Sequence, residues 1–276
     1  MAAWFIGFPA KSQDNFVVYQ LNIFNDTQEK ILLTEHQDEP FLLLQAINFR
    51  EDESAFKNWE ELTRLLDQQM KRDVGNVRLL TELFFTTHQL MLKDYAKHAY
   101  FSKTLTDGVY DCVTGTGLFA ILLDRYQIPY WIVETDEHVY IKGDFKGTAF
   151  IMESTFPEHG LITGKRNIKN FENQFLPNGS PSSVDNSPVG IGNVRELSGS
   201  GRDFNYIGLR ELAGLQYYND AIKKFYEKAY KDAYVQLIKA AYLYPSSRIS
   251  DLKSKMEILL GFISVDSQIQ KTNFQE

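Results

Sequence analysis

Residues 110–153 limit the possible folds of this chain more than any other segment. The run from 112 to 126 is almost continuously apolar, and little polar face is left beside Leu118, Phe119, Ile121, Leu122 and Leu123. A helix of this kind is buried on most sides, so we expect it at the centre of the fold. Three runs rich in aromatic and β-branched residues follow, at 130–134, 138–142 and 148–153, with turn residues between them. The segment predicts an α+β fold in which a buried helix packs on an antiparallel sheet.

The rest of the chain divides by composition and periodicity. Residues 54–101 repeat apolar side chains at helical spacing, whereas the short apolar runs within 16–50 fit either strands or short helices. Residues 173–203 are rich in Pro, Gly, Ser and Asn and predict a long loop. We expect an N-terminal segment at 1–35, a main domain at 36–172, a linker at 173–206 and a helical segment at 207–276.

Composition excludes some partners. The formal net charge of −7 and the lack of a Lys and Arg cluster argue against nucleic acid as a partner. No apolar run approaches the ~18 residues needed to cross a bilayer, so no membrane span is expected. The chain has one cysteine, Cys112, and therefore no intrachain disulfide.

The first twelve residues fit two interpretations. Residues 2–9 are apolar, and a small-x-small pattern follows at 10–12, although a basic leader is missing. If 1–12 is the remnant of an export signal, the protein belongs to the periplasm or cell envelope. If it is an ordinary first strand, the protein is cytoplasmic.

Cys112 also fits two interpretations. A free cysteine often packs as a small buried hydrophobe. Here, however, Asp111 is a good N-cap residue, which places Cys112 in the first turn of the central helix. The positive end of a helix stabilises a thiolate, and its free amides are able to hold an oxyanion. Gly115 and Gly117 weaken the helix, which predicts a close approach by a backbone or a substrate.

The strand runs bring a histidine and an acid together. If 138–144 and 147–153 form a hairpin with Phe145 and Lys146 at its tip, Asp144 pairs with Gly147 and His138 lies opposite Glu153. Cross-strand neighbours have Cβ atoms about 5 Å apart, so Glu153 is able to orient one imidazole nitrogen and leave the other facing Cys112.

The segments YDCVTGTGLFAILLDRYQIPYWIVETDEHVYI and IMESTFPEHG resemble the core of the transglutaminase-like superfamily of papain-fold cysteine enzymes. The resemblance covers about 108–160. It implies a papain-like core with Cys112 as nucleophile, His138 as base and Glu153 as the orienting acid. It also implies hydrolysis or acyl transfer at an amide of a peptide or protein substrate. The sequence has no zinc-site, P-loop or dinucleotide fingerprint, so no cofactor or metal is expected.

A non-catalytic alternative remains open. The superfamily more often has Asp at the position of Glu153, and the carboxylate of Asp111 disfavours a thiolate at Cys112. In that alternative the chain is an inactive transglutaminase-like interaction module.

The C-terminal part is similar to one tetratricopeptide repeat. Residues 214–247 place Ala221, Ala233 and Ala240 beside larger side chains, Pro245 closes the unit, and 249–263 supplies a capping helix. This resemblance implies a protein partner bound by the C-terminal helices, whereas the alternative is an unrelated helical hairpin. The loop at 173–203 either shields the Cys112 cleft or only tethers these helices. His88, His98 and His159 lack the spacing of a metal site.

Overall fold

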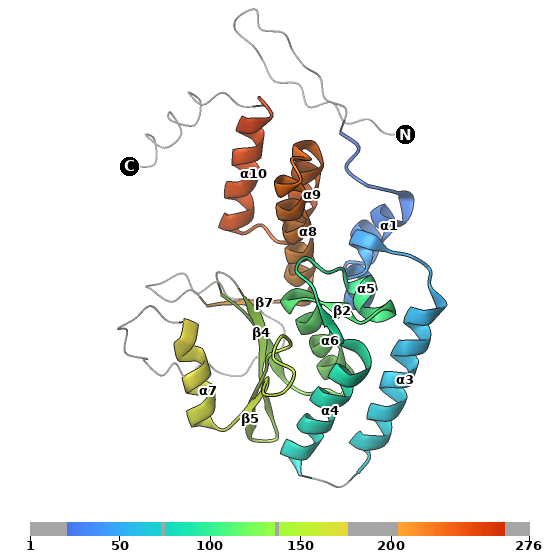
Figure 1. Cartoon of the computed structure of the whole chain (residues 1–276), viewed down its shortest axis with the longest axis vertical. Coiled ribbons are helices and arrows are strands. Elements are labelled where there is room, and N and C mark those ends of the chain that lie inside the picture. The colour runs from blue at the N-terminus through green and yellow to red at the C-terminus, as the bar shows by residue number, and fades with distance from the viewer. Residues whose placement is uncertain (1–20, 73–74, 136–137, 176–203, 263–276) are drawn as a thin grey trace, which may run out of the picture.

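The computed structural model describes residues 21–72, 75–135, 138–175 and 204–262 (Figure 1). The suggested signal remnant at 1–12 lies outside these residues, and so does the suggested cleft loop at 173–203 except for its first three residues. The described part of 16–50 is helical: α1 spans Thr27–Glu35, α2 spans Pro40–Leu43, and a 3₁₀ turn, η1, spans Ala46–Asn48. The sequence left strands and short helices open for this region, and the described residues form short helices.

The helical prediction for 54–101 is largely confirmed. Helices α3 (Glu53–Met70) and α4 (Asn76–Met91) pack against each other. The chain then departs from the prediction, because β1 (Asp94–Tyr95) pairs in parallel with β2 (Val109–Tyr110). The short helix α5 (Phe101–Thr106) lies between these strands, and Gly108 follows it with a positive φ of 79°.

The predicted helix on an antiparallel sheet is confirmed. Helix α6 spans Cys112–Arg125 and contacts β3 (Tyr130–Glu134) and β4 (Val139–Phe145). Strands β5 (Thr148–Met152), β6 (Leu161–Thr163) and β7 (Asn205–Ile207) complete the sheet. The strand order is β6-β5-β4-β3-β7, and every pair is antiparallel.

The two faces of the sheet are covered by different elements. Ile132, Ile141 and Phe150 face the large core shared with α6. Their strand neighbours Val133, Tyr140 and Ile151 form a second cluster with Ile168 of α7 (Lys165–Glu172). Alternation along a strand sends successive side chains to opposite faces, which explains the near-continuous apolar runs of β3, β4 and β5. A 3₁₀ turn, η2, follows α7 at Asn173–Phe175.

The predicted hairpin register is wrong by two residues. Phe145 pairs with Thr148 and Ile141 pairs with Met152, so Lys146 and Gly147 form the tip. Both tip residues have positive φ, 51° and 84°, as a two-residue type I′ turn requires. Because the slip is an even number of residues, each side chain stays on its predicted face.

The C-terminal segment is helical, as predicted. It comprises α8 (Leu209–Tyr226), α9 (Tyr230–Leu243) and α10 (Ser247–Leu259), and α9 packs along both neighbours. Residues 205–206, expected to be part of a linker loop, instead belong to β7 and pair with β3. Leu212 and Leu237 of these helices share one buried core with Leu118 of α6. Among the described residues, no helix has the length and apolar character to cross a bilayer.

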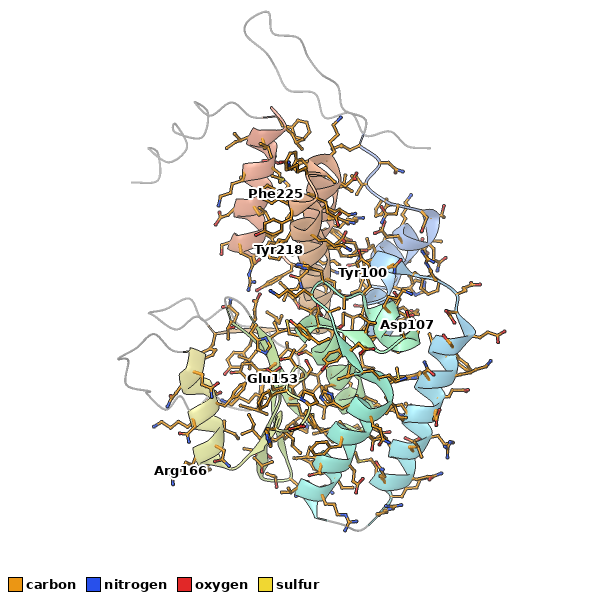
Figure 2. The ribbon with its side chains drawn as sticks, in the orientation of Figure 1. Tyr100, Asp107, Glu153, Arg166, Tyr218 and Phe225 are labelled. Carbon is orange, nitrogen blue, oxygen red and sulfur yellow. The ribbon has the colours of Figure 1, made fainter. Side chains whose placement is uncertain are left out.

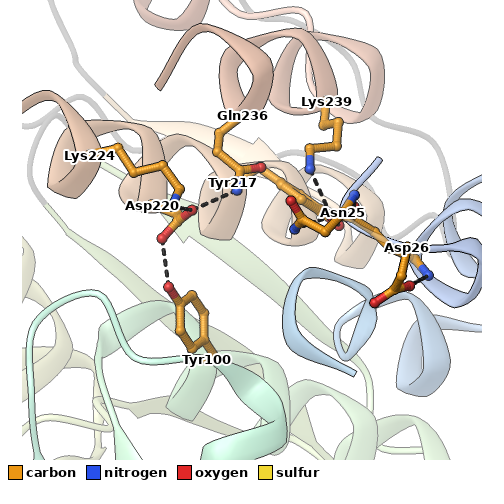
Figure 3. Close-up of polar contacts among 9 residues, drawn as sticks. Asn25, Asp26, Tyr100, Tyr217, Asp220, Lys224, Gln236 and Lys239 are labelled. Carbon is orange, nitrogen blue, oxygen red and sulfur yellow. Dashed lines mark hydrogen bonds and ion pairs between the residues drawn. The ribbon is translucent and has the colours of Figure 1, made fainter. Parts of the chain in front are cut away.

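A network of buried polar side chains joins α1 to α8 and α9 (Figure 3). The ammonium of Lys239 lies 2.8 Å from Oε1 of Glu29, and the Tyr217 hydroxyl donates to the same oxygen at 3.0 Å. In the same region, the carboxylate of Asp220 accepts hydrogen bonds from the Tyr100 hydroxyl and from the side-chain amide of Gln236. The expected N-terminal segment and the C-terminal helices are therefore held directly to each other.

Candidate active site

The start of α6 is built as the sequence predicts. The carboxylate of Asp111 accepts a hydrogen bond from the Thr114 amide at 2.9 Å, and the Asp111 amide donates to the Thr114 hydroxyl at 3.0 Å. This reciprocal capping box fixes where the helix begins. Cys112 is consequently its first residue, and the Cys112 amide is one of the N–H groups that have no partner inside the helix.

His138 and Glu153 are hydrogen-bonded to each other. Nε2 of His138 and Oε2 of Glu153 share the bond, and Glu153 is almost fully buried. Figure 2 labels Glu153 among the crowded side chains in the middle of the molecule. The other carboxylate oxygen accepts from the Thr155 amide at 2.8 Å and from the Thr155 hydroxyl at 2.7 Å. Glu153 is thus held at both oxygens, and it directs Nδ1 of His138 away from itself.

The Cys112 side chain lies against the first residue of β4, beyond the last pair that β4 forms with β5. Pairing between these two strands stops at Met152, so the edge of Val139 is open to α6. The Thr116 hydroxyl donates to the Val139 carbonyl at 3.3 Å, and the Val139 amide faces the Cys112 sulfur. The structure therefore places Cys112 beside the backbone of the residue that follows His138. Direct contact between the sulfur and Nδ1 of His138 stays a prediction.

The surroundings of Cys112 disfavour the thiolate form of its side chain. Burial raises the pKa of Cys112 to about 12, and the nearby carboxylates of Asp111 and Glu153 act in the same direction. The Val139 amide opposes this shift but does not outweigh it. Burial likewise raises the pKa of Asp111 to about 6, against the hydrogen bonds from Thr114. The sulfur is therefore protonated near neutral pH.

Tyr95 is a neighbour of the site that the sequence did not reveal. It pairs with Tyr110 in the β1–β2 ladder, and the two rings meet edge to face with centroids 6.0 Å apart. Its side chain is more than half exposed, and burial raises the pKa of its phenol, followed by the charges of Cys112 and Asp111. The phenol thus stays protonated, and it lies close enough to the thiol for the charge of Cys112 to act on it.

Gly115 lets the segment that follows β5 pack against α6. A Cβ atom at Gly115 would lie 2.6 Å from the Ser154 Cβ and 2.7 Å from its hydroxyl. The predicted close approach is therefore made by a side chain rather than by a backbone or a substrate. At Gly117 the corresponding neighbours are Leu44 and Leu212. Ser154 is fully buried, and its hydroxyl has no hydrogen-bond partner among the described residues.

The other histidines do not form a metal centre. His88 packs among Phe84, Phe119 and Tyr110, and burial lowers its pKa to about 4. His159 lies in an exposed turn. Within the described ranges, no group of three or more His, Cys, Asp or Glu side chains is arranged to hold a metal ion.

A scan against models of protein families, a search of curated proteins and a search of solved structures each found no match to this chain. Its function is therefore argued from the geometry of the site.

Proposed function

We propose that this protein is a transglutaminase-like thiol enzyme that breaks an amide or peptide bond by hydrolysis or acyl transfer. The hydrogen bond between His138 and Glu153, at the strand end beside the Cys112 helix start, is the observation that carries the proposal. It fits the role of an oriented general base next to a nucleophile. In the same proposal, α6 and the sheet form a papain-like core.

The proposed roles follow from the hydrogen bonds. Glu153 holds Nε2–H of His138, which leaves Nδ1 as the acceptor for the thiol proton. The Cys112 amide at the start of α6 is the first donor to an oxyanion, because it has no partner inside the helix. Tyr95, whose pKa is raised, is the second donor in this proposal.

The chemistry then proceeds in two halves. The Cys112 sulfur attacks the amide carbonyl carbon while Nδ1 of His138 takes the thiol proton. The tetrahedral intermediate collapses when His138 returns that proton to the leaving nitrogen, and the C–N bond breaks to give a thioester. Water or an amine next attacks the thioester, again with His138 as base, and the thiol is regenerated as it leaves. Water gives hydrolysis and an amine gives acyl transfer.

The raised pKa of Cys112 decides how the first half begins. A thiol with a pKa of about 12 does not form a resting ion pair with imidazole near neutral pH. Proton transfer to His138 therefore accompanies the attack, as in a serine enzyme. Removal of the base should slow the attack strongly, since general-base catalysis contributes about 10²–10⁴-fold.

A second candidate function is a non-catalytic interaction module. The same raised thiol pKa favours it, because a partly buried cysteine that stays protonated is ordinarily inert. In this candidate the repeat-like helices α8 and α9 bind a protein partner, and Tyr226 and Tyr242 are exposed aromatic side chains on them. The two candidates differ in whether Cys112 ever carries an acyl group.

The test is capture of that acyl group. The full-length chain is incubated with p-nitrophenyl acetate and with a panel of peptides that contain glutamine, and its intact mass is followed. Because Cys112 is the sole cysteine, a thioester that hydroxylamine removes maps to one residue. The enzyme proposal expects this adduct in the wild type and not in Cys112→Ala, with slow formation in His138→Ala. Absence of an adduct from every probe would leave the interaction module as the function.

A further inference from the structure

The hairpin end that carries His138 is held by the C-terminal helices. Glu134 is the last residue of β3, and its side chain is 1% exposed. The hydroxyl of Tyr244, at the end of α9, donates to Oε2 of Glu134 at 2.5 Å. The guanidinium of Arg248, in the first turn of α10, binds the other carboxylate oxygen. A buried carboxylate needs such partners, because an unpaired charge in the interior is costly.

Arg248 also reaches the residue that fixes His138. Its guanidinium donates to the Thr135 carbonyl at 3.0 Å. Thr135 in turn exchanges three hydrogen bonds with the His138 backbone: its amide and its hydroxyl donate to the His138 carbonyl at 2.8 and 3.1 Å, and its hydroxyl accepts from the His138 amide at 3.0 Å. A continuous chain of contacts therefore leads from α10 to His138.

The guanidinium is itself held in place by α8. Its central carbon lies 5.8 Å from the centre of the Tyr218 ring. Tyr218 belongs to α8 and is labelled in Figure 2. All three C-terminal helices thus contribute one side chain to this contact: Tyr218 from α8, Tyr244 from α9 and Arg248 from α10. A planar guanidinium that is fixed on one face and bonded at its edge sets the position of its partners with little freedom.

We propose that Arg248 and Tyr244 are positioning residues for His138, so that the C-terminal helices are part of the catalytic apparatus and not an appended binding module. This inference rests on the proposed function for its catalytic meaning. His138 must meet both Glu153 and the thiol, and a misplacement of about 1 Å in such a site reduces the rate about 10²-fold.

The variants are chosen to separate positioning from stability. Arg248→Gln removes the guanidinium from Glu134 and Thr135. Tyr244→Phe deletes one hydroxyl and keeps the ring, in case the first variant does not fold. The matched control is Lys253→Gln, since Lys253 lies on the same helix, has 31% side-chain exposure against 30% for Arg248, and pairs with Glu257 of α10 itself.

Two readouts are made on the full-length chain. The first is the ¹⁵N and ring-proton NMR signal of His138, assigned by its loss in His138→Gln. It reports the hydrogen bond to Glu153 without any catalysis. The second is the rate of Cys112 alkylation by iodoacetamide at about pH 7.

We expect Arg248→Gln to broaden or shift the His138 ring signal and to slow alkylation about tenfold or more. Tyr244→Phe should act in the same direction by a smaller factor, and Lys253→Gln should match the wild type. An unchanged His138 signal and alkylation rate in folded Arg248→Gln, or in Tyr244→Phe if the first variant does not fold, would overturn the inference. The His138 signal of Arg248→Gln could shift while His138→Gln alkylates at the wild-type rate. That result would support Arg248 as a positioning residue and contradict the proposed function.

Discussion

Nε2 of His138 is hydrogen-bonded to Oε2 of Glu153, although the two residues are not directly opposite each other in the hairpin. The register that pairs Ile141 with Met152 would set Tyr140 against Glu153, so His138 reaches Glu153 diagonally. Diagonal neighbours on one face are within reach of long side chains. His138 precedes β4 and Glu153 follows β5, so both residues lie just outside the paired part of the hairpin.

Tyr95→Phe should separate acyl chemistry from simple thiol reactivity. Acylation by p-nitrophenyl acetate passes through an oxyanion, whereas displacement of iodide from iodoacetamide does not. We expect acylation of Cys112 to slow about 10- to 100-fold, as loss of one oxyanion donor does elsewhere, while alkylation stays at the wild-type rate. Equal effects on both reactions would mean that the Tyr95 hydroxyl is not an oxyanion donor.

Gly115→Ala should damage the site through packing. Its Cβ would overlap Ser154, and overpacking of a full core typically costs about 1–3 kcal/mol, more than the gain in helix propensity of about 1 kcal/mol. Urea unfolding measures the change. Gly117→Ala is the matched control, because its Cβ would meet only the flexible end of Leu44 at 3.1 Å and Leu212 at 3.4 Å.

A second substitution checks the cause of that loss. Ser154→Gly removes the atoms that Gly115→Ala would strike, so the double variant should recover much of the lost stability. A double variant as unstable as the sum of its two single variants would show that Ser154 is not the obstacle.

Asp111→Asn should change how stability depends on pH. Burial raises the pKa of Asp111 from 3.8 to about 6, so between these values the native state binds more protons than the unfolded state. Its contribution is therefore present below about pH 4 and is lost as pH rises through 6. Asparagine keeps the N-cap without the charge. The stability of Asp111→Asn relative to wild type should rise by on the order of 2 kcal/mol between pH 4 and 7.

The same variant has an effect on the thiol. Because the Asp111 carboxylate helps to raise the pKa of Cys112, its removal should lower that pKa and speed alkylation above pH 6. Asp111→Ala should share the faster alkylation but lose about 1 kcal/mol with the cap. A pH profile of stability that is parallel in Asp111→Asn and wild type would contradict the buried-carboxylate account.

Lys239→Met should loosen the N-terminal helix. It leaves the carboxylate of Glu29 buried beside Tyr217 without its cation, and removal of one member of a buried pair costs about 3–5 kcal/mol. Burial lowers the pKa of Lys239, and both side chains of the pair are buried. Thermal and urea unfolding measure the loss.

A double variant tests whether charge is the cause. Glu29→Gln with Lys239→Met removes both charges and should be more stable than Lys239→Met alone. Lys253→Gln, at a partly exposed pair, should change stability by less than about 1 kcal/mol. If the double variant is no better than the single one, packing and not charge accounts for the loss.

Much of the central fold follows from the sequence for physical reasons. The apolar run at 112–126 has the length of a buried helix, and the runs after it have the length and the β-branched residues of strands. The N-cap Asp111 fixes where the helix begins. The sequence predicts the pairing of His138 with Glu153 despite a wrong register, because a slip of two residues keeps each side chain on its face of the sheet. Lys146 stands where Asn or Asp is usual in this turn, and Gly147 alone is a weak signal, which explains that error.

Other parts of the site depend on contacts distant in sequence. Strand β7 is three residues long and pairs with β3 although residues 135–204 separate the two strands in the sequence, so no local pattern predicts it. The contact of Arg248 with Glu134 joins residues 114 positions apart. A carboxylate at the end of an apolar strand, such as Glu134, was the available signal that a cation would be needed there.

The most direct test of the account is the rate at which iodoacetamide alkylates Cys112 at about pH 7. Intact mass reports this one site, because the chain has no other cysteine. The account predicts that wild type reacts at least about tenfold faster than His138→Ala, with Glu153→Gln between them, while all three unfold cooperatively. Equal and slow alkylation in folded wild type and folded His138→Ala would contradict it and leave Cys112 an inert residue of the core.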